Sequence, residues 1–357
     1  MATIKDVARV AQVSIATVSA VLNGTARVSE KRSRRVWDAV RTVGYTPHGI
    51  ARSLRLGHTR SIGLIVGDIS NPFFTSLAKA VEARASATGY SVILANSDEN
   101  PAKEANLIQV LLEQRVAGIL LAPSGYDQPY LKALASIARV PTVLVDRQLP
   151  SDAYDSVIVD NLAAARMVTD YLLRLNHKRI AIMVGRQHLS TSEQRLRGYR
   201  ESLQAAGLRV NPGLEFEAES RIDTAYKVAQ RLLSMSEPPS AIFAANNLMM
   251  LGAIEAILDM GFTCPDEISL AGVDDFEGGS AIRPRLTTVS QPIEDMGTHA
   301  VDRLLHRIGE RSAAKRDPVH TTILQPTFKI RDSCAPLGAS ARPSKPTRRV
   351  VSSAKGA

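Results

Sequence analysis

Seven histidines and two cysteines are the residues of this 357-residue sequence most able to do chemistry, and their spacing fits no catalytic motif. The histidines are His48, His58, His177, His188, His299, His306 and His320. The sequence lacks the His-Glu-x-x-His spacing of a zinc site, the Gly-x-Ser-x-Gly nucleophile elbow and both glycine-rich nucleotide-binding fingerprints. Cys264 and Cys334 are too few for a metal cage or a disulfide scaffold. The sequence therefore disfavours an enzyme and predicts neither a cofactor nor a metal site.

Composition places few further limits on the chain. Apolar residues make up 45% and charged residues 22%, which is typical of a well-packed protein. A length of 357 residues predicts two or three domains. No apolar run is long enough to span a membrane, and the N-terminus lacks the basic and apolar regions of a secretory signal. We therefore expect a cytoplasmic protein that has no membrane partner.

Charge is distributed unevenly along the chain. Residues 1–60 contain 11 Lys and Arg against 3 Asp and Glu, and residues 334–357 contain 5 basic residues and no acidic one. The intervening residues 61–333 carry 28 basic and 32 acidic residues. Basic ends on a mildly acidic body indicate a polyanion that meets the ends of the chain, although a solvated charge excess gives the same pattern.

The elements that position the basic head, residues 1–47, are three short helices. The first covers residues 4–11, the second runs from an N-cap at Ser14 to about Leu22, and the third runs from Ser29 to Gly44. The positions expected to face inward are Ile4, Val7, Ala8, Ala11, Val13, Val18, Val21, Leu22, Val36, Trp37 and Val40. Two short helices joined by a tight turn, with a third packed across them, predict a helix-turn-helix.

Short strings in the head follow one another in a specific order. They are Thr3-Ile-Lys-Asp-Val-Ala8, Val13-Ser14-x-x-Thr17-Val18-Ser19, Val28-Ser29 and Gly44-Tyr45-x-Pro47. The pattern continues without a gap through Ala51-Arg-Ser-Leu-Arg55 to Ser61-Ile-Gly63. These strings resemble the head of the lac repressor and purine repressor (LacI/GalR) family of transcriptional regulators.

The resemblance implies that the helix after Ser14 lies in the major groove of an operator. The residues it assigns to DNA in the head are Thr3, Ser14, Ile15, Ala16, Thr17, Ser19, Ala20 and Asn23. The hydroxyls and Asn23 would contact mostly phosphates. Relatives often carry an arginine or another polar reader at the position of Ala20. Base recognition here would therefore depend more on methyl contacts, and the operator sequence stays open.

Residues 48–60 resemble the family's hinge helix and linker. In that family the hinge orders when two chains lie side by side on DNA. Leu54 would then be the apolar wedge that kinks the minor groove, and Arg55 would contact phosphate nearby. The resemblance thus implies a homodimer on a pseudo-palindromic, double-stranded operator.

The body, residues 61–333, alternates β-rich runs with helical segments. The runs are 62–66, 91–95, 117–121, 142–145, 157–159, 180–184, 241–244 and 268–273. This alternation predicts parallel α/β sheets, and eight or more strands predict two sheets with a cleft between two subdomains.

Several strings extend the family resemblance through the body. They include Asp68-Ile-Ser-Asn-Pro-Phe-Phe74, Val145-Asp-Arg147, Arg195-x-x-Gly198-Tyr199, Asn246-Asn247 and Gly272-x-Asp274-Asp275. The resemblance implies a periplasmic-binding-protein-like core. Its N-subdomain would comprise 61–160 and 292–320, and its C-subdomain 161–291 and 321–333. Residues 334–357 are expected to form a disordered basic tail. This tail lacks a leucine heptad for tetramerisation, so we expect a dimer.

The same resemblance assigns an effector site to the cleft. The implied residues are Phe73, Phe74, Arg147, Arg195, Asn246, Asp274 and Gln291. Carboxylate, amide and guanidinium groups beside an aromatic wall suit a polyol. Ser220 and Arg221 stand where relatives often place an aromatic platform, and Leu189 replaces an arginine of the purine-binding member. A purine is therefore disfavoured, whereas a neutral sugar and a sugar acid or sugar phosphate both remain open.

These features predict a dimeric DNA-binding regulator, most simply a repressor, whose operator affinity a sugar or sugar derivative controls. A regulator of the same family that answers to a protein partner is the main alternative. A solute-binding protein would lack the basic head, and an enzyme would need motifs that the sequence does not contain.

Overall fold

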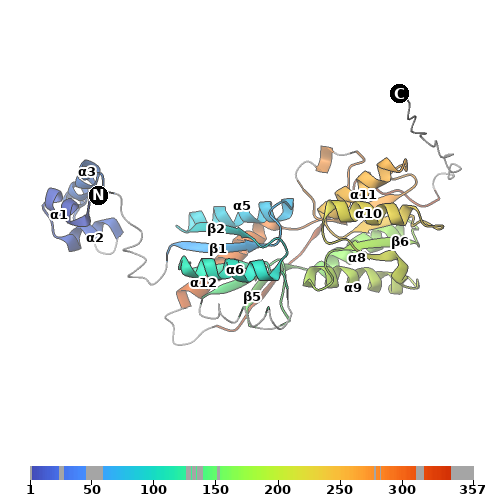
Figure 1. The fold of residues 1–357 in the computed structure, drawn as a ribbon, viewed down its shortest axis with the longest axis horizontal. Helices are drawn as coiled ribbons and strands as arrows, with labels where there is room; N and C mark the ends of the chain where they lie inside the picture. The colour runs from blue at the N-terminus through green and yellow to red at the C-terminus, as the bar shows by residue number, and fades with distance from the viewer. Residues whose placement is uncertain are drawn as a thin grey trace, which may run out of the picture. The chain divides into compact units, whose positions relative to one another are not determined.

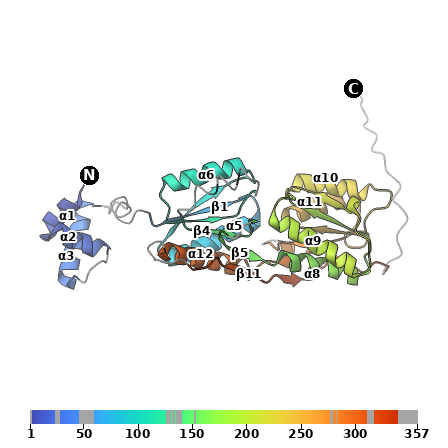
Figure 2. The ribbon, with the colours of Figure 1, turned by 90° about the horizontal axis from the view of Figure 1, so that it is seen from below.

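A computed structural model describes residues 2–23, 28–45, 59–125, 130, 134, 140–150, 153–276, 279–281, 283–310 and 317–338 (Figures 1 and 2). The chain divides into two compact units, a head up to Arg60 and a body that begins at Ser61. Among the described helices, none is both long and apolar enough to cross a membrane.

The described part of the head contains three helices: α1 (Ile4–Ala11), α2 (Ile15–Asn23) and α3 (Glu30–Val43). Their shared core consists of buried small residues, including Val7, Val18 and Val36. α3 ends at Gly44, whose φ of 62° is readily adopted by glycine. The predicted helix-turn-helix is therefore confirmed. The expectation that Trp37 faces inward is wrong: this side chain is 42% exposed, and Ala39 completes the inner face between Val36 and Val40.

The first sheet of the body is entirely parallel, in the order β11-β5-β4-β3-β1-β2. Its strands are β1 (Ser61–Val66), β2 (Ser91–Asn96), β3 (Gly118–Leu121), β4 (Thr142–Val145), β5 (Asp155–Val159) and β11 (Thr321–Leu324). Helices α5 (Pro72–Ala87) and α12 (Ile293–Gly309) cover one face, and α6 (Pro101–Glu113) covers the other (Figure 2). Most strands are apolar on both faces because helices bury both. We call this unit the N-subdomain.

The second sheet has the order β12-β10-β9-β8-β6-β7, and only β12 runs antiparallel to its neighbour. Its strands are β6 (Ile180–Val184), β7 (Glu215–Glu217), β8 (Ala241–Ala244), β9 (Ser269–Val273), β10 (Thr287–Ser290) and β12 (Thr327–Lys329). Two helix pairs cover its faces, α8 (Asn161–Arg174) with α9 (Ser190–Ala205), and α10 (Ile222–Leu233) with α11 (Asn247–Asp259) (Figure 2). We call this unit the C-subdomain. The predicted pair of α/β sheets is confirmed.

The chain crosses between the subdomains three times. It leaves the N-subdomain after β5, returns between β10 and α12, and crosses again between β11 and β12. The predicted boundary at 320–321 is wrong, because residues 321–324 pair with β5 of the N-subdomain. The third crossing therefore lies at 325–326.

Residues 334–337 continue along the C-subdomain beyond the predicted boundary at 333. The N–H of Ala335 donates to Ser269, and the N–H of Leu337 donates to the carbonyl of Leu175. The remaining tail, residues 339–357, lies outside the described residues.

Candidate functional site

The residues predicted to contact DNA begin with two helix N-termini of the head. Thr3 caps α1, where its hydroxyl accepts from the N–H of Asp6. The Ser14 hydroxyl accepts from the N–H of Thr17 at 3.1 Å and so caps α2. Ile15 is 45% exposed although it is apolar, and Ala16 beside it is also exposed. Thus α2 presents small polar and methyl groups on its first turn.

Other predicted DNA contacts lie further along the chain. Ser19 and Ala20 are half-buried in α2, and Asn23 is the last residue of this helix. The hinge residues Leu54 and Arg55 lie outside the described residues, so the structure does not test the predicted wedge.

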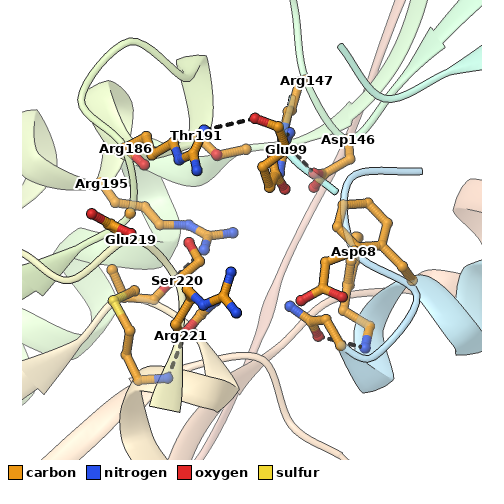
Figure 3. Close-up of a pocket in the computed structure, with 18 of the residues that line it drawn as sticks. Asp68, Glu99, Asp146, Arg147, Arg186, Thr191, Arg195, Glu219, Ser220 and Arg221 are labelled. Carbon is orange, nitrogen blue, oxygen red and sulfur yellow. Dashed lines mark hydrogen bonds and ion pairs between the residues drawn. The ribbon is translucent and has the colours of Figure 1, made fainter. Parts of the chain in front are cut away.

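A polar pocket lies between the two subdomains of the body (Figure 3). Its lining residues are Asp68, Asn71, Phe73, Phe74, Asp98, Glu99, Asp146, Arg147, Gly185, Arg186, Thr191, Ser192, Arg195, Glu219, Ser220, Arg221, Ala245, Asn246 and Met249. Many of them directly follow a parallel strand, as Asp146 follows β4 and Asn246 lies two residues beyond β8. The carboxyl ends of such strands are the usual ligand edge of α/β sheets. The topology therefore gathers these side chains at one cleft.

On the N-subdomain side, Arg147 is held by two carboxylates. Its Nη1 and Nη2 lie 2.7 and 2.6 Å from the oxygens of Glu99, and its Nε lies 3.4 Å from Asp146. The guanidinium also lies 5.5 Å from the centre of the Phe74 ring. Gly67 makes room for this pair, because a Cβ there would lie 2.1 Å from Oε1 of Glu99.

Burial and charge perturb Asp146. Burial raises the pKa of its carboxyl to about 6, although Arg147 and Arg195 oppose this shift. The neighbouring charge of Asp274 adds to the increase. A carboxyl of this kind changes protonation close to neutral pH, which makes the pocket sensitive to the charge of its contents.

On the C-subdomain side, the predicted residues Arg195 and Asn246 line the pocket. Arg195 donates from Nε to Asn161 at 2.8 Å and from Nη1 to the carbonyl of Ala245. Asn246 caps α11 by accepting from the N–H of Met249 at 2.8 Å. Its amide oxygen already accepts one hydrogen bond, and its Nδ2 group can donate to a ligand.

Both predicted aromatic residues line the pocket, and both also belong to the N-subdomain core. Phe73 and Phe74 are 4% and 3% exposed and meet edge to face, with ring centres 5.1 Å apart. Each ring therefore packs in the core and also forms part of the pocket lining.

Asp274 and Gln291 lie outside the pocket lining. They are buried and bonded to each other, with Nε2 of Gln291 donating to Oδ1 of Asp274. Burial raises the pKa of Asp274, whereas Arg195 and the bond from Gln291 act in the opposite direction. The Oε1 atom of Gln291 is buried and has no hydrogen-bond partner among the described residues. In this conformation the pair is buried and does not line the cavity.

Backbone strain concentrates at this cleft. Several lining residues other than glycine have positive φ. They are Asp98 (56°), Glu99 (53°), Asp146 (68°), Glu219 (49°) and Ser220 (59°). Such conformations cluster where function fixes a side-chain direction. The residues predicted for the site did not include Asp68, Asp98, Glu99 or Glu219. The place of the first three just after β1 and β2 was the available signal, whereas Glu219 follows β7, which the sequence did not predict.

Two of the described histidines contact other protein groups through their ring nitrogens. His177 is buried, and its ring nitrogens lie 3.0 Å from the Ser240 hydroxyl and 3.0 Å from the Ala335 carbonyl. His306 is partly exposed and lies 2.9 Å from Asp317 and 3.3 Å from Glu310. His306, Glu310 and Asp317 lie close enough together to hold a metal ion, but Glu310 is also paired with Arg307 at 2.8 Å.

A helix-turn-helix head on a two-subdomain α/β core with a polar cleft is the architecture of ligand-responsive transcriptional regulators. Comparison with known proteins identifies the group. Residues 59–331 match the periplasmic binding proteins and sugar-binding domain of the LacI family. Residues 3–48 match the bacterial regulatory proteins of the lacI family. The chain belongs to the LacI family of DNA-binding repressors.

Individual relatives cover nearly the whole chain. The transcriptional repressor PurR of Aliivibrio salmonicida is 34% identical over 88% of this chain and 95% of its own length. The ribose operon repressor of Escherichia coli K12 is 34% identical over 91% and 98%. These relatives are repressors, which confirms a regulator rather than an enzyme.

Solved structures show the same architecture. The lac repressor dimer bound to operator and an anti-inducer is 27% identical, with a TM-score of 0.82 over 94% of this chain and 99% of that chain. The regulator CelR in complex with cellobiose is 29% identical, with a TM-score of 0.70 over 93% and 100%.

Proposed function

We propose that this chain represses transcription as a homodimer and that a small, uncharged, hydroxyl-rich ligand bound in the cleft controls its affinity for operator DNA. The charge balance of the cleft is the observation that carries the ligand class. Five carboxylates and four guanidinium groups line it, and they are Asp68, Asp98, Glu99, Asp146, Glu219, Arg147, Arg186, Arg195 and Arg221.

Most of these guanidinium groups already have acceptors. Arg147 is paired with Glu99, Arg195 donates to Asn161 and Ala245, and Arg186 donates to the carbonyl of Glu99 at 2.6 Å. A phosphate or carboxylate would therefore enter among several carboxylates with few donors left for it. Sugar hydroxyls both donate and accept, so they suit the carboxylates and the Nδ2 group of Asn246 together.

The relatives support a sugar without determining which one. One relative regulates the ribose operon, and CelR was crystallised with cellobiose. The PurR relative does not support a sugar. In this chain, however, Leu189 and the carboxylate-rich lining provide few groups that could bind a purine. A neutral pentose, hexose or short saccharide is thus the favoured class.

The exposed first turn of α2 supports its role in the major groove. Ser14 and Ile15 are exposed there, and the helix dipole favours phosphate near the capping hydroxyl.

The edge of the first sheet supports a dimer. β2 is an edge strand, its Leu94 is 44% exposed, and Val110 of α6 is 50% exposed. We expect a second copy to cover these side chains.

A thermal-melting screen of the full chain tests the ligand class. The panel contains pentoses, hexoses, disaccharides, sugar acids, sugar phosphates and nucleosides, each at several concentrations. A neutral sugar at about 100 times its Kd should add about 2.7 kcal/mol of stability. Stabilisation by sugar phosphates or nucleosides alone would contradict the uncharged class.

The active compound is then added to the chain bound to a labelled pseudo-palindromic duplex. Its addition should change operator affinity in the wild type. The variant Arg195→Lys keeps the charge but removes the planar fork, so it should lose the response while it still binds DNA. A normal response in this variant would remove Arg195 from the effector site.

A further inference from the structure

Two asparagines join the subdomains beside the pocket. Nδ2 of Asn247, the first residue of α11, donates to Oδ1 of Asn71, which precedes α5. The two atoms are 3.1 Å apart. Asn71 is 6% exposed and Asn247 is 1% exposed. The bond therefore connects two helix N-termini across the cleft and is shielded from water.

A second hydrogen bond fixes the orientation of each amide. Oδ1 of Asn71 also accepts from the N–H of Phe73 at 2.9 Å and so caps α5. Oδ1 of Asn247 accepts from the N–H of Leu248 at 2.7 Å. Turning either amide over would replace an acceptor with a donor and break these local bonds. Asn71 therefore presents an acceptor to the cleft, and position 247 must supply a donor.

Among the described residues, other hydrogen bonds also cross the cleft, but they place weaker demands on the sequence. Arg186 donates to the backbone carbonyl of Glu99 at 2.6 Å, and the backbone N–H of Gln148 donates to Ser190 at 2.9 Å. Each needs only one particular side chain, because its other partner is backbone. The Asn71–Asn247 bond depends on the chemistry of both side chains.

We propose that Asn71 and Asn247 form a latch that favours the closed cleft in the unliganded protein, and that the donor at position 247 sets how readily the cleft opens. An aspartate at 247 would still accept from Leu248 but would place a carboxylate against Oδ1 of Asn71. The backbone N–H of Asn247 already faces the Asp274 carboxylate, so the new charge would also meet a like charge. The carboxylate against Oδ1 of Asn71 would push the subdomains apart, whereas the repulsion from Asp274 would act within the C-subdomain.

Three single variants of the full chain separate the latch from a general packing role. Asn71→Asp keeps the cap of α5 and keeps an acceptor for Asn247, so the latch survives. Asn71→Ser keeps the cap, since serine is a preferred N-cap residue, but its shorter side chain does not reach Asn247. Asn247→Asp keeps the bond to Leu248 and loses the donor. No effector or DNA is needed, so the result is independent of the proposed ligand class.

Amide hydrogen exchange measured by mass spectrometry without ligand provides the test. Peptides that cover 68–77 and 246–253 should exchange about fivefold faster in Asn71→Ser and Asn247→Asp, the change expected when a hydrogen bond of about 1 kcal/mol is lost. Asn71→Asp should exchange at the wild-type rate. Equal rates in the two Asn71 variants, or wild-type rates in Asn247→Asp, would overturn the latch. If Asn247→Asp does not fold, the Asn71 pair decides alone.

Discussion

Glu99 and Arg147 form a two-point ion pair at the N-subdomain wall of the cleft. Their side chains are 13% and 7% exposed, and their paired atoms lie 2.6 and 2.7 Å apart. Removing the carboxylate leaves a buried guanidinium that keeps a hydrogen bond to the carbonyl of Pro123 at 3.1 Å and the weaker contact to Asp146 as its only carboxylate contact. We expect Glu99→Ala to lower the free energy of unfolding by about 3 kcal/mol, as measured by urea denaturation at pH 7.

The pair of Arg285 with Asp332 is a suitable control, because both side chains are about half exposed. Water competes for exposed ions, so Arg285→Ala should cost less than about 1 kcal/mol. Equal losses in the two variants would mean that burial at the cleft does not strengthen the dependence of Arg147 on Glu99.

Asp155 connects β5 to α12, and its titration should be visible in acid. Burial alone would raise its pKa, but hydrogen bonds from Arg307 and Arg303 lower it to about 2. Because the pKa is below its ordinary value of 3.8, the stabilisation is complete above about pH 4 and is lost as the pH falls towards 2. Wild type should therefore be more stable than Asp155→Asn at pH 6. This advantage should shrink between pH 4 and pH 2 in denaturation curves, and a constant difference would rule out the assignment.

The eight strands with continuous apolar runs could be predicted from the sequence. Burial on both faces selects such runs in seven of them, and the edge strand β2 is apolar although it is partly exposed. The strands that prediction missed are the three-residue β7 and the polar or exposed β10, β11 and β12. β11 in particular reads Thr-Thr-Ile-Leu with Ile323 55% exposed, and its place beside β5 depends on pairing distant in sequence. The subdomain boundary was misplaced for this reason.

The cleft could be predicted only in part. Arg147, Arg195, Asn246, Phe73 and Phe74 line it, as the family resemblance implied. That resemblance did not indicate that Gln291 would bond Asp274 and that both would lie outside the pocket lining. This hydrogen bond depends on how the crossing after β10 lies against the end of β9, which a local sequence pattern does not indicate.

The pKa of Asp146 is shifted in the opposite direction to that of Asp155, so its effect on stability should change with pH in the opposite direction. Burial raises its pKa from 3.8 to about 6, so the folded chain holds a proton that the unfolded chain releases. Stability from this proton is complete below about pH 4 and is lost as the pH rises through 6. Asparagine at 146 resembles the protonated acid, so Asp146→Asn should gain stability relative to wild type as the pH rises from 4 to 7. Melting temperatures across this range test the effect, and a flat difference would contradict it.

Gly252 allows α10 and α11 to pack closely. A Cβ at this position would lie 2.2 Å from the carbonyl oxygen of Ile222 and 2.9 Å from the N–H nitrogen of Tyr226, which are both backbone atoms that cannot swing away. Gly252→Ala must therefore separate the two helices, and overpacking of this kind costs about 1–3 kcal/mol.

Gly309, the last residue of α12, has no atom within 4 Å of the corresponding position. Gly309→Ala should be neutral or stabilise by up to about 1 kcal/mol, since alanine favours helix more than glycine does. Urea denaturation of both variants makes the comparison, and a loss of stability in Gly309→Ala as large as that in Gly252→Ala would show that helix contact is not the cause.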